Sequence, residues 1–135
     1  MRVGNVLTTT LSNLVNGLAY DVTMTAVNAA GQSQPSGATR ETPARTPDPV
    51  VVQAPTLVEG PTGNSLRVSW TPGGDGGSAL TRLVVTPYLN GVAQADRVVA
   101  SASATSDEFP VPTDGSAWSF TVTVTNKAGS ATSNR

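Results

Sequence analysis

The chain has 135 residues, a formal net charge of −1 and 13% charged residues, and it contains no cysteine and no histidine. These numbers exclude a disulfide framework and a thiolate metal site, and they remove the commonest metal ligand and the commonest general base. The scattered Arg and the single Lys also argue against nucleic-acid binding, which needs clustered basic residues.

The N-terminal stretch, residues 1–10, lacks the apolar segment of a secretory signal peptide. No stretch reaches the roughly 18 apolar residues of a membrane span, so we expect no membrane partner. If the protein acts outside a cell, we expect it to belong to a larger secreted chain or to be released without such a signal. A phage virion part freed by lysis would be an example.

The first predicted strand covers residues 20–26 and follows an Asn-Gly turn signal at 16–17. Its apolar members, Tyr20, Val22, Met24 and Ala26, alternate with polar residues. Alternation with a period of two places the apolar side chains on one face of a strand, as in an antiparallel sheet with one wet face.

A proline-rich segment comes next, with Pro43, Pro47 and Pro49 close together. Proline disfavours helix and cannot donate to a strand ladder, so we predict a short semi-rigid linker over residues 44–52. The alternative is that these prolines belong to the first strand of the following domain.

The remainder of the chain reads as short strands separated by turns, without helical periodicity. Turn signals stand at Asp75-Gly76, Asn90-Gly91 and Asp114-Gly115. The apolar residues that alternate with polar ones, and that we expect to face a core, are Leu66, Val68 and Trp70 in one strand and Trp118, Phe120, Val122 and Val124 in another.

An internal repeat relates the two parts of the chain. Residues 20–31 align with residues 118–129 without a gap, at an offset of 98 residues. A sandwich of the immunoglobulin type needs about 100 residues, so this offset indicates two copies of one domain type rather than two halves of one domain.

Several segments resemble fibronectin type III domains in order and spacing. Residues 14–36 resemble the E–F loop, the F strand and the start of the G strand, residues 54–72 resemble the A and B strands, and residues 76–85 resemble the B–C turn and the C strand. Two positions depart from the family pattern. Leu83 stands where a Tyr is usual, and Trp118 stands where the corner Tyr is expected, so that corner is built differently.

The resemblance implies an all-β fold, an immunoglobulin-like antiparallel β-sandwich present as one near-complete and one partial copy. Residues 1–43 would hold strands E, F and G, residues 44–52 the linker, and residues 53–135 strands A to F with G truncated. A partial sandwich leaves a sheet edge open. Either the chain is a piece of a longer tandem array, or a neighbouring chain supplies the missing strands by strand exchange.

Catalytic chemistry is not predicted. Without histidine no Ser-His pair can form, and the glycine-rich stretch 73–77 lacks the Lys and the following helix of a phosphate-binding loop, so we predict a flexible loop there. Asp107 and Glu108, the only adjacent acidic pair, would point to opposite faces of a strand. We therefore expect no enzyme, no cofactor and no metal site.

Three residues are candidates for surface contacts: Tyr88, Asp75 and Lys127. Tyr88 is the one aromatic residue not assigned to a core face, and a single ring is a poor platform for carbohydrate. Asp75 lies in a predicted loop at residues 71–79, and Lys127 in another at residues 126–130. Loops at the ends of sandwiches carry recognition in related folds, although these two lack the aromatic or Arg anchors of binding hot spots.

These observations favour a non-catalytic structural or adhesion module of a tandem-repeat surface protein. We expect it on a virion surface, as a phage tail or capsid decoration component, or in the extracellular part of a bacterial surface protein. Its partners would be other protein chains or neighbouring repeats. The alternatives are a spacer or carbohydrate-associated module of a secreted polysaccharide-degrading enzyme, and a binding module that uses its loops.

Overall fold

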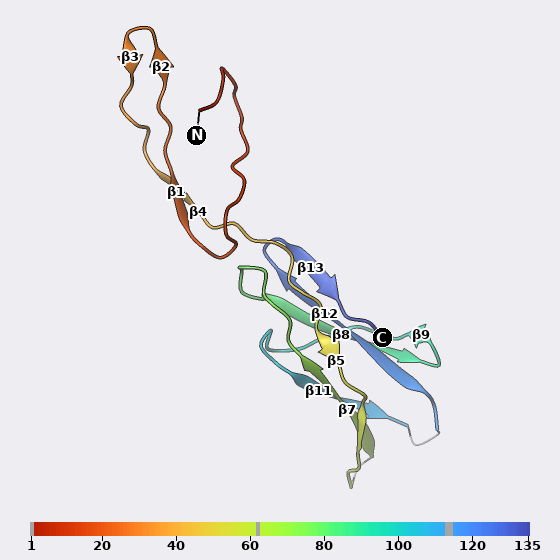
Figure 1. Cartoon of the computed structure of the whole chain (residues 1–135). Coiled ribbons are helices and arrows are strands. Elements are labelled where there is room, and N and C mark those ends of the chain that lie inside the picture. The colour runs from red at the N-terminus through yellow and green to blue at the C-terminus, as the bar shows by residue number, and fades with distance from the viewer. Residues whose placement is uncertain (1, 62, 113–114) are drawn as a thin grey trace. The chain divides into compact units, whose positions relative to one another are not determined.

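The computed structural model describes residues 2–61, 63–112 and 115–135. Over these ranges the chain is all-β, with antiparallel sheets and no helix (Figure 1). The search for apolar helices long enough to cross a membrane accordingly finds none in the described residues. Contacts divide the chain into two units, Met1–Pro43 and Ala44–Arg135, which are described separately here.

Unit 1 consists of one long hairpin preceded by residues without regular structure. The strands β1 (Tyr20–Val22) and β4 (Thr39–Glu41) form its base, and β2 (Val27–Asn28) and β3 (Gly31–Gln32) form its tip (Figure 1). The predicted apolar face is present in the sequence but is not buried, since Met24 is 73% exposed. The alternation therefore predicted the position of the hairpin arm, but the apolar face of that arm is exposed.

Two serines explain why the predicted strand at residues 20–26 is interrupted. The backbone N–H of Ser36 donates to the Met24 carbonyl oxygen at 2.8 Å, and the Met24 N–H donates to Ser36 Oγ at 3.0 Å. Ser33 makes the same two contacts with Ala26, at 2.8 and 2.9 Å. Because a hydroxyl replaces a carbonyl in each pair, the regular ladder stops between β1 and β2 although the arms stay together.

Unit 2 contains two antiparallel sheets (Figure 1). In one sheet the order is β10-β8-β12-β13, with β9 also paired to β8, and in the other β7 pairs with β11, β5 and β6. The strands are β5 (Val51–Val52), β6 (Thr56–Val58), β7 (Asn64–Thr71), β8 (Arg82–Leu89), β9 (Val92–Ala93), β10 (Arg97–Val98), β11 (Ser106–Val111), β12 (Trp118–Asn126) and β13 (Gly129–Thr132).

Side chains from both sheets of unit 2 form a single hydrophobic core. Trp70 of β7 is 3% exposed and Phe120 of β12 is 2% exposed, as their alternation predicts. Trp118 and Tyr20, also predicted to face a core, are only half-buried. The buried members of the core cluster are Val50, Val68, Trp70, Leu83, Val85, Phe109, Phe120, Val122 and Val124.

The adjacent acidic residues of β11, Asp107 and Glu108, form ion pairs with different arginines. Asp107 Oδ2 lies 2.8 Å from Arg97 Nε, and because Arg97 is in β10 this ion pair joins strands of different sheets. Glu108 Oε1 lies 2.6 Å from the guanidinium of Arg67, its register partner in β7. The expectation that the two carboxylates point apart is therefore confirmed, and each neutralises a separate cation.

The segment 44–52 differs from the linker that its prolines predict. Contacts assign it to unit 2, Val50 is 4% exposed within the core, and Val51–Val52 pairs with β7 at Trp70 and Thr71. Proline favours extended backbone but has no N–H to donate. It is therefore tolerated at the edge of a sheet, where not every N–H has to pair. The segment therefore belongs to unit 2, as the alternative expects, although its strand is only Val51–Val52 and the prolines precede it.

Candidate functional site

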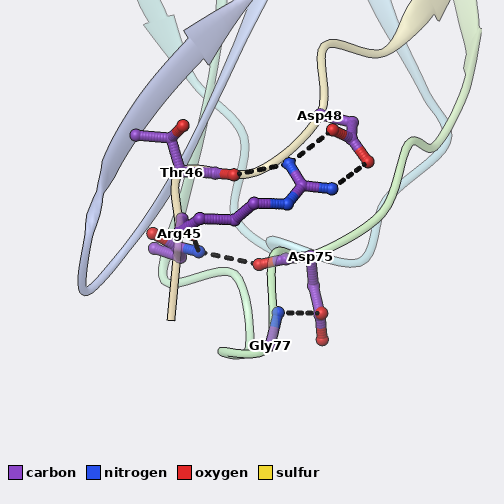
Figure 2. Close-up of polar contacts among 6 residues, drawn as sticks. Arg45, Thr46, Asp48, Asp75 and Gly77 are labelled. Carbon is purple, nitrogen blue, oxygen red and sulfur yellow. Dashed lines mark hydrogen bonds and ion pairs between the residues drawn. The ribbon is translucent and has the colours of Figure 1, made fainter. Parts of the chain in front are cut away.

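The loops at one end of unit 2 close around the segment that enters it. We call this cluster the Asn126 clamp, and it comprises Arg45, Thr46, Asp48, the loop 73–77 and Asn126. Figure 2 shows the Arg45 guanidinium held between Thr46 and Asp48, with Asp75 and Gly77 of the neighbouring loop alongside. The clamp joins side chains and backbone groups of three segments in one polar network, and we treat it as the candidate site.

Asn126, the last residue of β12, connects three separate segments. Its Nδ2 donates to the carbonyl oxygens of Arg45 at 2.8 Å and Asp75 at 2.7 Å. Its Oδ1 accepts from the backbone N–H groups of Ala128 at 2.8 Å and Gly129 at 3.2 Å. An amide side chain offers two donors and one oxygen with two lone pairs, so this buried amide, 4% exposed, is fully used.

Arg45 and Asp48 form a bidentate ion pair on the outer side of the clamp. Arg45 Nη1 donates to Asp48 Oδ1 at 2.6 Å and Nη2 donates to Oδ2 at 2.9 Å, which is the fork geometry of strong charge-assisted pairs. The hydrogen bond from Arg45 lowers the pKa of the Asp48 carboxyl, and the same bond raises the pKa of Arg45. Both side chains are about half exposed, so solvent screens the pair.

The glycine-rich loop packs against the entering segment, backbone to backbone. The N–H of Asp48 donates to the Gly74 carbonyl at 2.8 Å, and the N–H of Arg45 donates to the Gly76 carbonyl at 2.9 Å. A Cβ at Gly76 would lie 2.3 Å from the Arg45 carbonyl oxygen, and Gly76 also has a φ of +72°. Because glycine lacks a Cβ, the two backbones can approach this closely. The loop predicted to be flexible is therefore held by hydrogen bonds to the entering segment and to Asn126.

Two of the three predicted contact residues belong to this end of unit 2. Asp75 Oδ1 accepts from the Gly77 N–H at 2.8 Å, a turn contact, and the Asp75 carbonyl accepts from Asn126. Lys127 directly follows Asn126, in the exposed turn between β12 and β13. The structure therefore brings Asp75 and Lys127 to the same set of loops.

Tyr88 lies apart from them, near the other end of β8. In β8 it is six residues beyond Arg82, a span of about 20 Å along a strand. The ring is half-buried, and the Arg135 guanidinium carbon lies 4.9 Å from the ring centroid. Because a cation already occupies this face of the ring, the open aromatic platform that carbohydrate would need is not found here.

Sequence reasoning missed Asn126, Arg45 and Asp48. A signal for Asn126 was present in the repeat, because Asn28 occupies the equivalent position 98 residues earlier. Asn28 Oδ1 accepts from the Ala30 N–H at 2.8 Å, which reproduces the Asn126 contact with Ala128. Because the two asparagines make the same turn contact, we infer that their role is structural. No local sequence pattern indicates the ion pair of Arg45 and Asp48.

The hydrogen bonds of the clamp attach the entering segment to the loops of unit 2. The hydrogen-bond donors and acceptors named above pair with one another, and the described residues contain no group of three or more His, Cys, Asp or Glu side chains able to hold a metal ion. A comparison of the chain with protein-family models finds no match.

Proposed function

We propose that this chain is a non-catalytic structural or adhesion module of a tandem-repeat surface protein, built from sandwiches of the fibronectin type III kind. Its place would be a phage virion, as a tail or capsid decoration component, or a bacterial cell surface. Support comes from the repeat at an offset of 98 residues, the family resemblance, and the two antiparallel sheets whose side chains share one core.

The Asn126 clamp is the observation that carries the proposal. Any tension passed along the backbone from unit 1 reaches unit 2 through residues 43–45. At that point the Arg45 carbonyl is bonded to Asn126 and the Arg45 N–H to Gly76. The clamp precedes β5 in the chain, and β5 itself makes only a short pairing with β7. The hydrogen bonds of the clamp are therefore the first contacts of unit 2 that such a force loads. A module in a string of domains needs this kind of attachment at its point of entry.

Protein partners are supported by the exposed apolar side chains of unit 1. Met24, Val27 and Leu18 are all more than half exposed, and so is Val15. Four such side chains within 13 residues of one hairpin arm and its preceding turn offer apolar surface that a protein partner could cover. Neighbouring repeats or other protein chains are therefore the proposed partners.

The mechanical role is tested by pulling single molecules of the whole chain by their ends. The Asn126→Ala variant should release the entering segment of unit 2 at a lower force than the unmodified chain, because two carbonyl contacts are lost. Asn28→Ala is the matched control, since Asn28 is exposed and lies at the equivalent turn of unit 1. Equal release forces for the Asn126→Ala variant and the unmodified chain would refute the mechanical role of the clamp.

A further inference from the structure

Two Asn-Gly pairs lie in exposed turns that the proposed function does not use. They are Asn16-Gly17 in unit 1 and Asn90-Gly91 in unit 2. An asparagine before glycine can lose its side-chain amide, because glycine has no side chain to hinder attack by its own backbone nitrogen. The attack requires an N–H that can give up its proton and a side-chain carbonyl that can take up negative charge. The surroundings of the two turns differ.

In unit 1 the attacking group is already engaged. The Gly17 N–H donates to the Pro43 carbonyl oxygen at 2.9 Å. This hydrogen bond holds the proton on the nitrogen and fixes the direction of the N–H, so it has to break before the nitrogen can reach the Asn16 side chain. The Asn16 turn is therefore protected for as long as this contact persists.

The corresponding N–H in unit 2, that of Gly91, makes no hydrogen bond to any described residue. Asn90 has a φ of +49° and Gly91 a φ of +86°, and positive values at both residues are the pattern of a type I′ turn, here joining β8 to β9. Gly91 makes its contact through its carbonyl oxygen, which accepts from Arg135 Nη1 at 3.4 Å. The Gly91 nitrogen can therefore attack without first leaving a partner in the described structure.

The side-chain carbonyl of Asn90 has a hydrogen-bond donor beside it. Ala117 donates its backbone N–H to Asn90 Oδ1 at 3.2 Å, and Asn90 donates its own N–H to the Ala117 carbonyl oxygen at 2.8 Å. When the Gly91 nitrogen adds to Asn90 Cγ, negative charge develops on Oδ1, where the Ala117 N–H already lies. A backbone donor at such an oxygen stabilises the addition.

We propose that Asn90 is a site of spontaneous deamidation. The Gly91 nitrogen forms a bond to Asn90 Cγ, the bond from Cγ to Nδ2 breaks, and Nδ2 leaves as ammonia with the proton of the Gly91 N–H. Water then opens the resulting cyclic succinimide. Hydrolysis at Cγ gives an aspartyl residue, and hydrolysis at the backbone carbonyl carbon gives an isoaspartyl residue. The inference does not depend on the proposed function.

Either product changes the end of the β8–β9 hairpin. Both add one negative charge to a chain whose formal net charge is −1. The aspartyl product keeps an oxygen that can accept the Ala117 N–H, so it should retain the turn. The isoaspartyl product routes the backbone through Cγ and lengthens the turn by one atom. Because the geometry of a short turn sets the register of its strands, the pairing of Leu89 with Val92 should then be lost.

Ageing the whole chain at mildly alkaline pH, in native buffer and in parallel in denaturant, tests the proposal. Trypsin separates the two sites, because residues 83–97 and residues 3–40 are different tryptic peptides. Fragmentation in the mass spectrometer assigns the conversion to Asn90 or to Asn16. In denaturant both N–H groups are solvated, so the two sites should convert at similar rates. In native buffer Asn90 should convert at least about fivefold faster than Asn16.

The native sample can contradict the proposal in several ways. Equal rates at the two sites, faster conversion of Asn16, or an Asn90 that stays intact would each overturn it. Direct hydrolysis of the amide gives aspartate alone, so an isoaspartyl methyltransferase should label the peptide of residues 83–97, and an absence of label would overturn the succinimide route. Asn90→Gln is the matched control, because its longer side chain keeps the amide but disfavours ring closure. Conversion at position 90 of this variant as fast as in the unmodified chain would also refute attack by the Gly91 nitrogen.

Discussion

The side-chain amide of Asn126 donates to the backbone carbonyl of Arg45 at 2.8 Å, although the two residues are 81 positions apart in the sequence. The same amide holds the Asp75 carbonyl at 2.7 Å. One asparagine thus fixes the start of unit 2 to two of its loops. It does so through backbone atoms, which any residue type at position 45 or 75 would supply.

Replacing Asn126 by Ala should lower the free energy of unfolding of unit 2 by about 3 kcal/mol, because two carbonyls and two N–H groups lose a buried partner. The equivalent Asn28→Ala change in unit 1 should leave the free energy of unfolding of unit 2 within about 0.5 kcal/mol of the unmodified chain. Chemical denaturation followed by tryptophan fluorescence measures unit 2 in both variants, since Trp70 and Trp118 lie in unit 2. Similar losses for the two variants would contradict the clamp.

A Cβ at position 76 should not be tolerated. Gly76→Ala places a methyl group against the Arg45 carbonyl at a φ of +72°, and it should destabilise unit 2 by about 2 kcal/mol or more. Gly37→Ala is the matched control, because an added Cβ there meets nothing within 4 Å. Thermal unfolding of the two variants gives the comparison, and an unchanged midpoint for Gly76→Ala would show that the loop moves freely.

The Arg45–Asp48 pair should make the stability of unit 2 depend on pH. The folded-state pKa of Asp48 lies below its ordinary value of 3.8. The contribution is therefore present above that value and is lost as pH falls through the folded-state pKa. The pKa of Arg45 is raised, so Arg45 stays charged throughout.

The measurement is the difference in denaturation midpoint between the unmodified chain and Asp48→Asn. It should be present at pH 7 and shrink as the pH is lowered below about 4. Other carboxyl groups titrate in both proteins, so only the difference is informative. A difference that stays constant down to pH 2 would contradict the assignment to this pair.

The neighbouring acids of β11 should respond unequally to removal. The Asp107 side chain is 16% exposed, forms an ion pair with Arg97 across the two sheets, and accepts the Glu108 N–H at Oδ1, although its Oδ2 has no hydrogen-bond partner; Asp107→Ala should therefore cost about 2 kcal/mol. The Glu108 side chain is 44% exposed and pairs with Arg67 on the outer face, and Glu108→Ala should cost less than about 1 kcal/mol. Equal losses in denaturant unfolding would show that the contact between sheets adds nothing.

Local pattern was enough to predict the strands and much of the core. Alternation placed Val68, Trp70 and Phe120 on inward faces, and they are buried. The same pattern at Met24 gave a hairpin arm whose apolar residue is exposed. Periodicity fixes which side chains share a face, but burial requires a second surface, and this depends on residues far away in the sequence.

The parts that could not be predicted depend on backbone contacts between distant segments. The prolines at 43–49 indicate extended structure equally well for a free linker and for a strand held along a sheet. The glycines at 73–77 indicate conformational freedom equally well for a mobile loop and for close packing. Only their mutual contact, such as Asp48 N–H to the Gly74 carbonyl at 2.8 Å, decides between the readings. A surface contact at Tyr88 stays a prediction, and local pattern could not show that the Arg135 guanidinium lies 4.9 Å from the centroid of its ring.

The close fit between the glycine-rich loop and the entering segment also bears on protein engineering. A loop with this composition would be the usual choice for grafting a foreign peptide, yet a Cβ at Gly73 or Gly76 would already lie within 3 Å of the backbone of residues 45–49. At Gly91, in the turn between β8 and β9, an added Cβ would meet nothing within 4 Å. A displayed epitope should therefore be accommodated at that turn, and the same insert at the glycine-rich loop should detach the start of the module.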